Sequence, residues 1–213
     1  MSPVEVVKVA LLQTGVSWIL WFLAVLSILG FAVGFERLWT LWRAKADLRK
    51  LSEQLDKDLA AGGVAQALAQ MQAPAVAAAI ARAGLRLAHL GPTAADRAMQ
   101  SAVALERARL ERGLTFLATL GNNAPFIGLF GTVVGVIAAF EHLGRGGHGG
   151  AAASAEVMAS IAEALVTTAV GIAVALPAVA MHNAIQRQIT GLLQGADALS
   201  NLVLAYLTAE KQP

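Results

Sequence analysis

The chain has 213 residues, of which 57% are hydrophobic and only 14% are charged. Soluble domains average about 45–50% apolar and about 25% charged residues, so this composition indicates a membrane protein. The absence of cysteine excludes a disulfide framework, a thiolate nucleophile and a cysteine-ligated metal site, and a net charge of +2 gives no support to nucleic-acid binding.

Three stretches are long and apolar enough to cross a bilayer. Residues 1–35 contain an N-terminal segment and the first transmembrane helix, whose apolar part matches one hydrocarbon thickness. This apolar run is too long for a signal peptide and lacks a small-residue cleavage site, so we expect it to persist in the mature protein. Residues 113–140 form the second transmembrane helix, and residues 157–186 form the third, which contains a single formal charge, Glu163.

The basic residues predict how these spans are oriented. Residues 36–112 contain 12 of the 16 lysines and arginines, whereas the Gly/Ala-rich loop at residues 141–156 contains only Arg145. Because basic residues favour the cytoplasmic side, we expect residues 36–112 to be a cytoplasmic helical domain and the loop at 141–156 to be periplasmic. The N-terminus is then periplasmic, and residues 187–213 form a cytoplasmic C-terminal helix.

The segment between the first two spans is predicted to be helical almost throughout. Its first helix continues the first span without a break and ends at Gly62-Gly63. Thr93, with Asp96 three residues later, fits a capping-box start for another helix, which we expect to run through Gly113 into the second span. The fold class is therefore an all-α membrane protein with three transmembrane helices and long cytoplasmic helical extensions.

The C-terminal helix is predicted to have one apolar side. Apolar residues recur there at helical spacing, and such a stripe needs a partner surface in the same chain or in another copy of it. The residues of this stripe are Leu192, Ala196, Leu199, Val203 and Tyr206.

Glu163 is the residue that most strongly indicates a function. An acidic side chain at the centre of a span costs on the order of 2.5–3.5 kcal/mol, and such residues tend to face a bundle interior or water. Thr167 lies one turn further on the same helix face and Thr168 lies beside it, so hydroxyls flank the carboxylate. We interpret the three residues as a candidate proton pathway. The alternatives are a Glu163 that is solvated at the outer interface and threonines that bond their own i−4 carbonyls.

The second span combines small residues with a few polar ones. Thr132 is an isolated hydroxyl that we expect to face the polar residues of the third span, and Asn122 and Asn123 are candidates for helix packing. Small residues let helix backbones approach closely, and prolines are tolerated inside membrane helices. The residues expected to shape the packing of the second and third spans are Gly128, Gly131, Gly135, Pro125 and Pro177.

Other patterns do not support enzymatic chemistry. Gly144, Gly146 and Gly149 satisfy G-x-G-x-x-G, but no strand precedes them and no βαβ unit can be built, so we expect no nucleotide site. The four histidines lack metal-ligand spacing, and only His182, near the inner end of the third span, is a functional candidate. We therefore expect no catalytic residue, no metal and no cofactor.

Taken together, these residues resemble a known family. The second span reads NAPFIGLFGTVVGVIAAF over residues 123–140, and the third reads IAEALVTTAVGIAVALPAV over residues 161–179. Both runs resemble the MotA/TolQ/ExbB proton channel family, and most closely its ExbB and TolQ branch. The predicted topology agrees with that family along the whole chain.

The resemblance implies an assembly and a mechanism. It implies a homopentamer in the bacterial inner membrane that encloses the single-span helices of ExbD- or TolR-like partners, each supplying a membrane aspartate. The family's intramembrane glutamate falls on Glu163, and its second-span and third-span threonines fall on Thr132 and Thr168. The implied function is a stator subunit that uses the proton-motive force to drive a periplasm-spanning TonB- or TolA-like protein, or a motility protein, with membrane lipids as surroundings and no nucleic acid.

Two other hypotheses compete with this function. A non-conducting helical membrane scaffold would pair Glu163 with a basic residue of a partner. A standalone transporter is disfavoured because three spans without an inverted repeat do not enclose a substrate site in one chain. Proton flux in liposomes distinguishes the channel from the scaffold.

Overall fold

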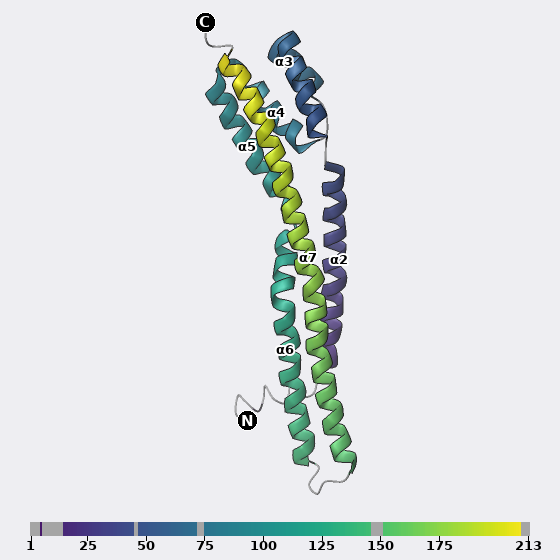
Figure 1. Ribbon diagram of the computed structural model, residues 1–213. Coiled ribbons are helices and arrows are strands. Elements are labelled where there is room, and N and C mark those ends of the chain that lie inside the picture. Colours follow the sequence, from purple (N-terminus) through teal and green to yellow (C-terminus); the bar gives the residue numbers. More distant parts are fainter. Residues whose placement is uncertain (1–4, 6–14, 45–46, 72–74, 146–150, 210–213) are drawn as a thin grey trace. The chain divides into compact units, whose positions relative to one another are not determined.

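The computed structural model describes residues 5, 15–44, 47–71, 75–145 and 151–209. The described residues contain no strand, and three helices are long and apolar enough to cross a membrane, so the prediction of an all-α chain with three long apolar helices is confirmed. The elements are α2 (Ser17–Ala44), α3 (Leu48–Gln70), α4 (Val76–Arg86), the 3₁₀ helix η1 (Ala88–Leu90), α5 (Pro92–Leu110), α6 (Leu114–Arg145) and α7 (Ala151–Ala209) (Figure 1).

The chain divides into two compact units. The membrane unit consists of Met1–Phe35 and Thr115–Asn183, and the polar unit consists of Glu36–Leu114 and Ala184–Pro213. Both α2 and α7 contribute residues to each unit.

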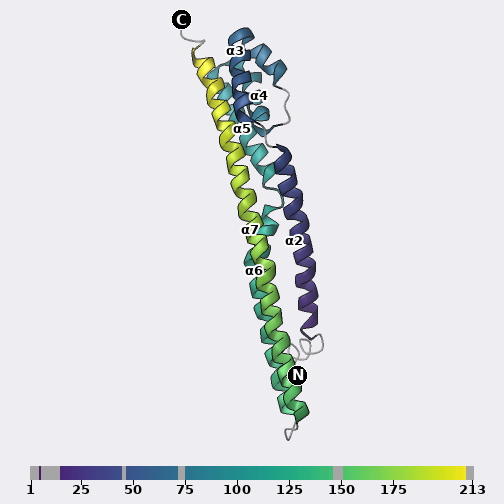
Figure 2. The same ribbon diagram turned by 45° about the vertical axis from the view of Figure 1, so that its right-hand side comes forward.

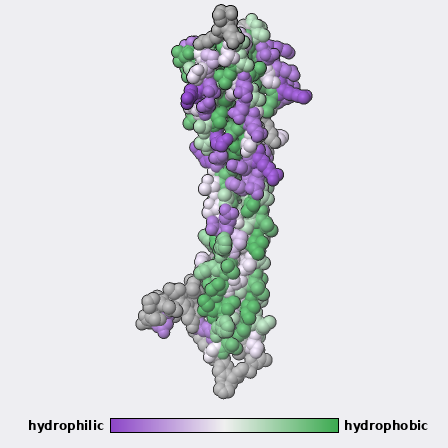
Figure 3. All heavy atoms as spheres, turned by 60° about the vertical axis from the view of Figure 1, so that its left-hand side comes forward, coloured by the Kyte–Doolittle hydropathy of each residue, from purple (hydrophilic) through white to green (hydrophobic). Residues whose placement is uncertain are grey.

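In the membrane unit, α2, α6 and the first part of α7 lie side by side in both ribbon views (Figures 1 and 2). Ile19 and Leu23 of α2 pack with Leu120 of α6 and Ala178 of α7 in one buried cluster. Many large apolar side chains point outward instead, among them Trp21, which is 74% exposed. Hydrophobic residues accordingly dominate the visible surface of this unit (Figure 3). Exposing so much apolar surface to water is unfavourable, whereas contact of the same surface with lipid is not.

The polar unit is a helical cluster whose visible surface carries most of the hydrophilic residues (Figure 3). In it, α4 packs on α5, with the fully buried Met99 lying against Gly84. The last part of α7 buries Ala196, Leu199 and Val203, so three of the five residues of the predicted apolar stripe are covered within the chain, whereas Leu192 and Tyr206 are half-buried. For those three residues the partner surface belongs to the same chain, and a second copy is not needed to cover them.

Two predicted continuous helices are interrupted, and these predictions were wrong. The helix of the first span ends at Ala44, and Asp47 is extended (φ −72°, ψ 95°) and caps α3 by accepting a hydrogen bond from the Lys50 amide at 3.4 Å. The helix before the second span ends at Leu110, and Gly113 adopts φ 81°, a conformation that glycine reaches without a steric penalty. Asp47 and Gly113 thus interrupt two helices that the hydrophobic pattern of the sequence alone would predict to be continuous.

The predicted capping box is also wrong. The N-cap of α5 is Gly91, and Pro92 occupies the first turn, where its missing N–H costs nothing. Asp96 instead accepts a hydrogen bond from Gln100 one turn later, at 2.9 Å. The nucleotide-like motif includes Gly146 and Gly149, which lie outside the described residues, as does His148.

Candidate functional site

Glu163 lies on α7 and its residue surface is exposed in the isolated chain. Its sequence neighbours Ile161, Leu165 and Val166 are exposed apolar residues. Of these, only Val166, one turn further on, lies on the same side of the helix as Glu163. An exposed carboxylate near the middle of a membrane span meets hydrocarbon when the chain is embedded alone, which is unfavourable. The exposed face around Glu163 therefore requires either water or another protein surface.

Ser17, at the start of α2, donates a hydrogen bond to Oε1 of Glu163 at 3.1 Å. The two residues are far apart in the sequence but belong to the same membrane unit. Nothing in the sequence distinguishes Ser17, because a lone serine at the start of an apolar span is an ordinary feature. Only the proximity of α2 to α7 makes it part of the site.

Thr167 is completely buried and donates to the carbonyl of Glu163 on its own helix, at 2.8 Å. This is the i−4 bond that threonine commonly makes in membrane helices. Its side chain lies against Gly131 of α6, where an added Cβ would be 2.5 Å from the Thr167 methyl carbon. In this chain Thr167 therefore contributes to the α6–α7 contact, and its hydroxyl proton is directed at the backbone.

The other two predicted hydroxyls also donate to backbone carbonyls. Thr168 donates across the helix interface to the Gly128 carbonyl at 3.1 Å, and Thr132 donates to the Leu129 carbonyl of its own helix at 2.6 Å. Each hydroxyl oxygen keeps lone pairs that can accept a hydrogen bond. The structure thus places both threonines at half-buried positions, and neither hydroxyl donates its proton to the Glu163 carboxylate.

Small residues line the contact between α6 and α7. A Cβ on Gly128 would lie 2.9 Å from the Thr167 carbonyl oxygen, and a Cβ on Gly135 would lie 2.6 Å from the Ala164 Cβ. On the α7 side, a Cβ on Gly171 would lie 2.7 Å from the Ala124 carbonyl oxygen. Since these neighbours are mostly backbone atoms, the helices must separate if side chains are added.

The two prolines lie within helices that continue through them. Pro125 is inside α6 and Pro177 is inside α7, and both are half-buried. Each removes one backbone donor, which membrane helices tolerate where neighbouring groups satisfy the freed carbonyl. Asn123, one of the polar residues before Pro125, donates to the Thr119 carbonyl at 2.8 Å and is exposed, as is Asn122.

The remaining ionisable groups of the membrane unit form no metal site among the residues that the structure describes. His142 of α6 lies 3.1 Å from a carboxylate oxygen of Glu156 on α7. His182 is half-buried and makes an interaction of its own. Glu163 is thus the carboxylate with the most apolar sequence surroundings in this unit.

The fold and the site define an all-helical membrane protein with an ionisable group in its third span. A profile of the MotA/TolQ/ExbB proton channel family matches residues 72–197, more than half of the chain. The chain belongs to the MotA/TolQ/ExbB proton channel family, and its relatives place it in the ExbB and TolQ branch.

Similar proteins come from several bacteria. A biopolymer transport protein ExbB of Xanthomonas campestris pv. campestris is 45% identical over 89 residues, which cover 41% of this chain and 34% of that protein. The Tol-Pal system protein TolQ of Pseudomonas aeruginosa is 45% identical over 87 residues, covering 41% and 36%. A putative biopolymer transport protein ExbB-like 1 of Synechocystis sp. is 35% identical over 159 residues, covering 72% and 61%. The aligned part therefore spans between about a third and three fifths of these relatives.

Proposed function

We propose that this protein is a proton-channel and stator subunit of a bacterial inner-membrane motor. It would assemble as a homopentamer and use the proton-motive force, together with an ExbD- or TolR-like single-span partner, to energise an envelope process. The family to which the chain belongs and the names of its relatives support this proposal. The driven protein is of the TonB or TolA type or serves motility.

The observation that carries the proposal is the exposed carboxylate of Glu163 on an apolar, membrane-length helix. Charged groups inside membranes are rare and face a bundle interior or a water-filled cavity. In the isolated chain Glu163 has no such cover, although Ser17 donates one hydrogen bond to it. A second copy of the chain and a partner helix would supply the cover and enclose a polar path.

The proposed pathway uses Glu163 with Thr132, Thr167 and Thr168. The hydroxyl oxygens can accept hydrogen bonds from water, and Glu163 can accept a proton or set the field that orders the water. Protonation of a partner aspartate would remove its charge and lower the cost of moving it past an apolar wall. Proton passage would in this way permit relative rotation of the partner helices.

The proposed topology places the N-terminus and the α6–α7 connection in the periplasm. The basic residues of the polar unit and the C-terminus would then lie in the cytoplasm, as their distribution favours. With this topology Ser17 and Glu163 lie toward the periplasmic side, where protons enter along the proton-motive force.

Proton flux tests the proposal. The full chain and its ExbD- or TolR-like partner are reconstituted in liposomes, and flux is measured under a membrane potential for wild type, Glu163→Gln and Glu163→Ala. Both variants are expected to reduce flux at least tenfold, because neither side chain titrates. Glu156→Gln is the matched control, since it removes an exposed carboxylate two turns earlier on α7 and is expected to leave flux within twofold of wild type.

The alternative function is a non-conducting helical scaffold. The observation in its favour is that all three threonine hydroxyls donate to backbone carbonyls, as purely structural residues do. Flux that is unchanged in both Glu163 variants, with normal assembly, would support the scaffold and contradict the channel.

A further inference from the structure

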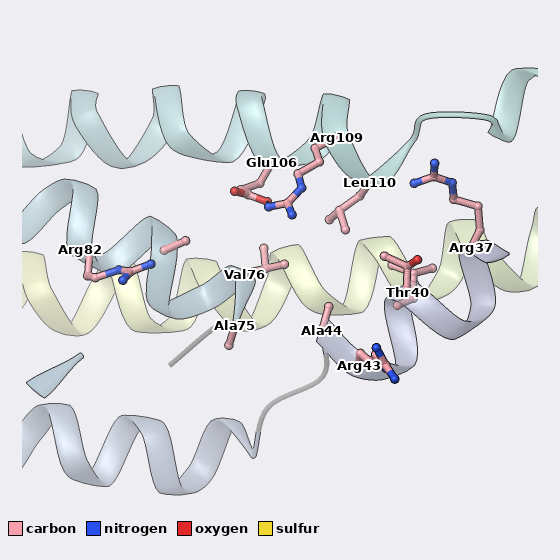
Figure 4. A pocket seen from close by; sticks show the side chains of 12 residues that line it. Arg37, Thr40, Arg43, Ala44, Ala75, Val76, Arg82, Glu106, Arg109 and Leu110 are labelled. Atoms are coloured by element: carbon pink, nitrogen blue, oxygen red, sulfur yellow. The ribbon is translucent and has the colours of Figure 1, made fainter. Parts of the chain in front are cut away.

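The polar unit contains a cavity that the proposed proton pathway does not use. Its volume is about 480 Å³, and its walls come from the end of α2, from α4 and from α5 (Figure 4). Four arginines and one glutamate contribute to the wall, which is otherwise mostly apolar. These charged residues are Arg37, Arg43, Arg82, Arg109 and Glu106.

The cavity wall contains more cationic than anionic side chains. Arg109 lies 3.7 Å from Glu106, and Arg43 stacks on the Trp39 ring at 5.0 Å. Arg82 has no ion-pair partner in the part of the chain that the structure describes. The cavity is therefore electropositive and suits an anion.

Arg37 supplies an unsatisfied donor at the same place. Its side chain is only 15% exposed, and one of its terminal nitrogens lies 3.3 Å from the exposed Glu36. Its Nε is buried and has no hydrogen-bond partner among the described residues. Buried donors are nearly always bonded, so this N–H marks a position where an acceptor is expected. Guanidinium groups match the planar, bidentate geometry of phosphate oxygens better than any other side chain.

The position of the cavity along the chain points to a membrane surface. Glu36 and Arg37 are the first charges after the uncharged run that ends at Phe35. Trp39 and Trp42, on the same helix, are 57% and 68% exposed, and exposed tryptophans are typical of the headgroup layer. Arg37 and Arg43 are six residues apart, a rise of about 9 Å along the helix, which is comparable with the depth of that layer.

We propose that this cavity binds the phosphate group of an anionic glycerophospholipid. Arg37, Arg82 and Arg109 contact the phosphate oxygens, with Arg37 Nε donating to one of them, whereas Arg43 lies on the Trp39 ring. The apolar wall formed by Leu41, Val76 and Leu110 accommodates the glycerol and the first acyl carbons. Lipid binding at this cavity does not require proton conduction, so a failure of the proposed function would leave the lipid site unaffected. A soluble phosphate compound has the same chemistry and is an outcome of the test below.

The test uses the full chain in a non-ionic detergent. Binding of dihexanoyl phosphatidylglycerol and of zwitterionic dihexanoyl phosphatidylcholine is measured by microscale thermophoresis. Wild type is expected to bind the anionic lipid at least tenfold more tightly. Arg82→Gln is expected to weaken that binding about fivefold, the usual effect of one basic residue at an anionic surface. Arg86→Gln is the matched control, because it removes the same charge one turn later on α4 from an exposed residue outside the cavity wall, and it is expected to change binding less than twofold.

A second variant is expected to bind the lipid more tightly, a result that misfolding would not produce. Glu106→Gln removes the one carboxylate of the cavity wall and releases Arg109, so it is expected to tighten binding of the anionic lipid severalfold. Equal affinity for the two lipids, or equal losses in Arg82→Gln and Arg86→Gln, would overturn the proposal. Inorganic phosphate or glycerol 3-phosphate that competes at the same concentrations as the lipid would overturn the lipid assignment and identify a site for soluble phosphate.

Discussion

Thr168 of α7 donates a hydrogen bond to the carbonyl oxygen of Gly128 on α6, with 3.1 Å between the two oxygens. The bond is possible because Gly128 has no side chain, which lets the α7 backbone approach closely enough for a short hydroxyl to reach the carbonyl. A residue assigned to a proton pathway is therefore also a link between two membrane helices. Its mutation is expected to affect stability as well as transport.

Thr168→Val removes this donor while preserving shape. Hydrogen bonds between membrane helices average about 0.6 kcal/mol and reach about 1.7 kcal/mol, so we expect a loss of stability in that range. Thr168→Ser retains the hydroxyl and is expected to retain most of the stability. Equilibrium unfolding in mixed micelles measures both variants. Equal stability of wild type and Thr168→Val would show that the bond contributes nothing.

Gly131→Ala introduces a Cβ that would lie 2.5 Å from the Thr167 methyl carbon. The helices must separate to accommodate it, and overpacking of this kind costs about 1–3 kcal/mol. Combining it with Thr167→Ser removes the clashing methyl group and is expected to restore part of the loss. Gly191→Ala is the control, because the added Cβ has no neighbour within 4 Å apart from the adjoining residues and the backbone of its own helix. A thermal melt in which Gly131→Ala and Gly191→Ala behave alike would contradict the close contact.

Ser17→Ala removes the donor that contacts Glu163. We expect a several-fold reduction of proton flux with little change in folding, because the carboxylate loses an oriented partner while the helix keeps its apolar contacts. Ser17→Thr preserves the hydroxyl and is expected to restore flux. The measurement is the liposome flux assay, with assembly checked by size-exclusion chromatography. Normal flux in Ser17→Ala would restrict Ser17 to a structural role.

Gly63 interrupts α3 with φ 68° and ψ −162°. This region of backbone space is almost restricted to glycine, so Gly63→Ala is expected to cost about 1–3 kcal/mol of stability. Gly191→Ala, at a helical position in the same unit, again provides the comparison and is expected to be neutral or slightly stabilising. Hydrogen exchange of the α3 amides would localise the effect. Unchanged protection and stability in Gly63→Ala would contradict the observed conformation.

Sequence periodicity predicted the three spans, but it could not predict where their helices end. An apolar run identifies a span because its length and hydrophobicity are local properties. The interruptions at Asp47 and Gly113 depend on one side-chain cap and one backbone conformation, and both compete with a helical pattern that continues past them. Such competition is decided by packing around the residue, which the sequence does not display.

The sequence by itself determined that the chain is an all-helical membrane protein and that Glu163 is an exceptional residue, because charged side chains within membrane spans are rare and are costly near the bilayer centre. The tertiary structure decided which groups meet: Ser17 contacts Glu163, Thr168 contacts Gly128, and Arg37 and Arg82 line one cavity. These contacts join residues that are distant in the chain. They arise when helices pack at specific rotations and depths, so no local pattern of residues contains them.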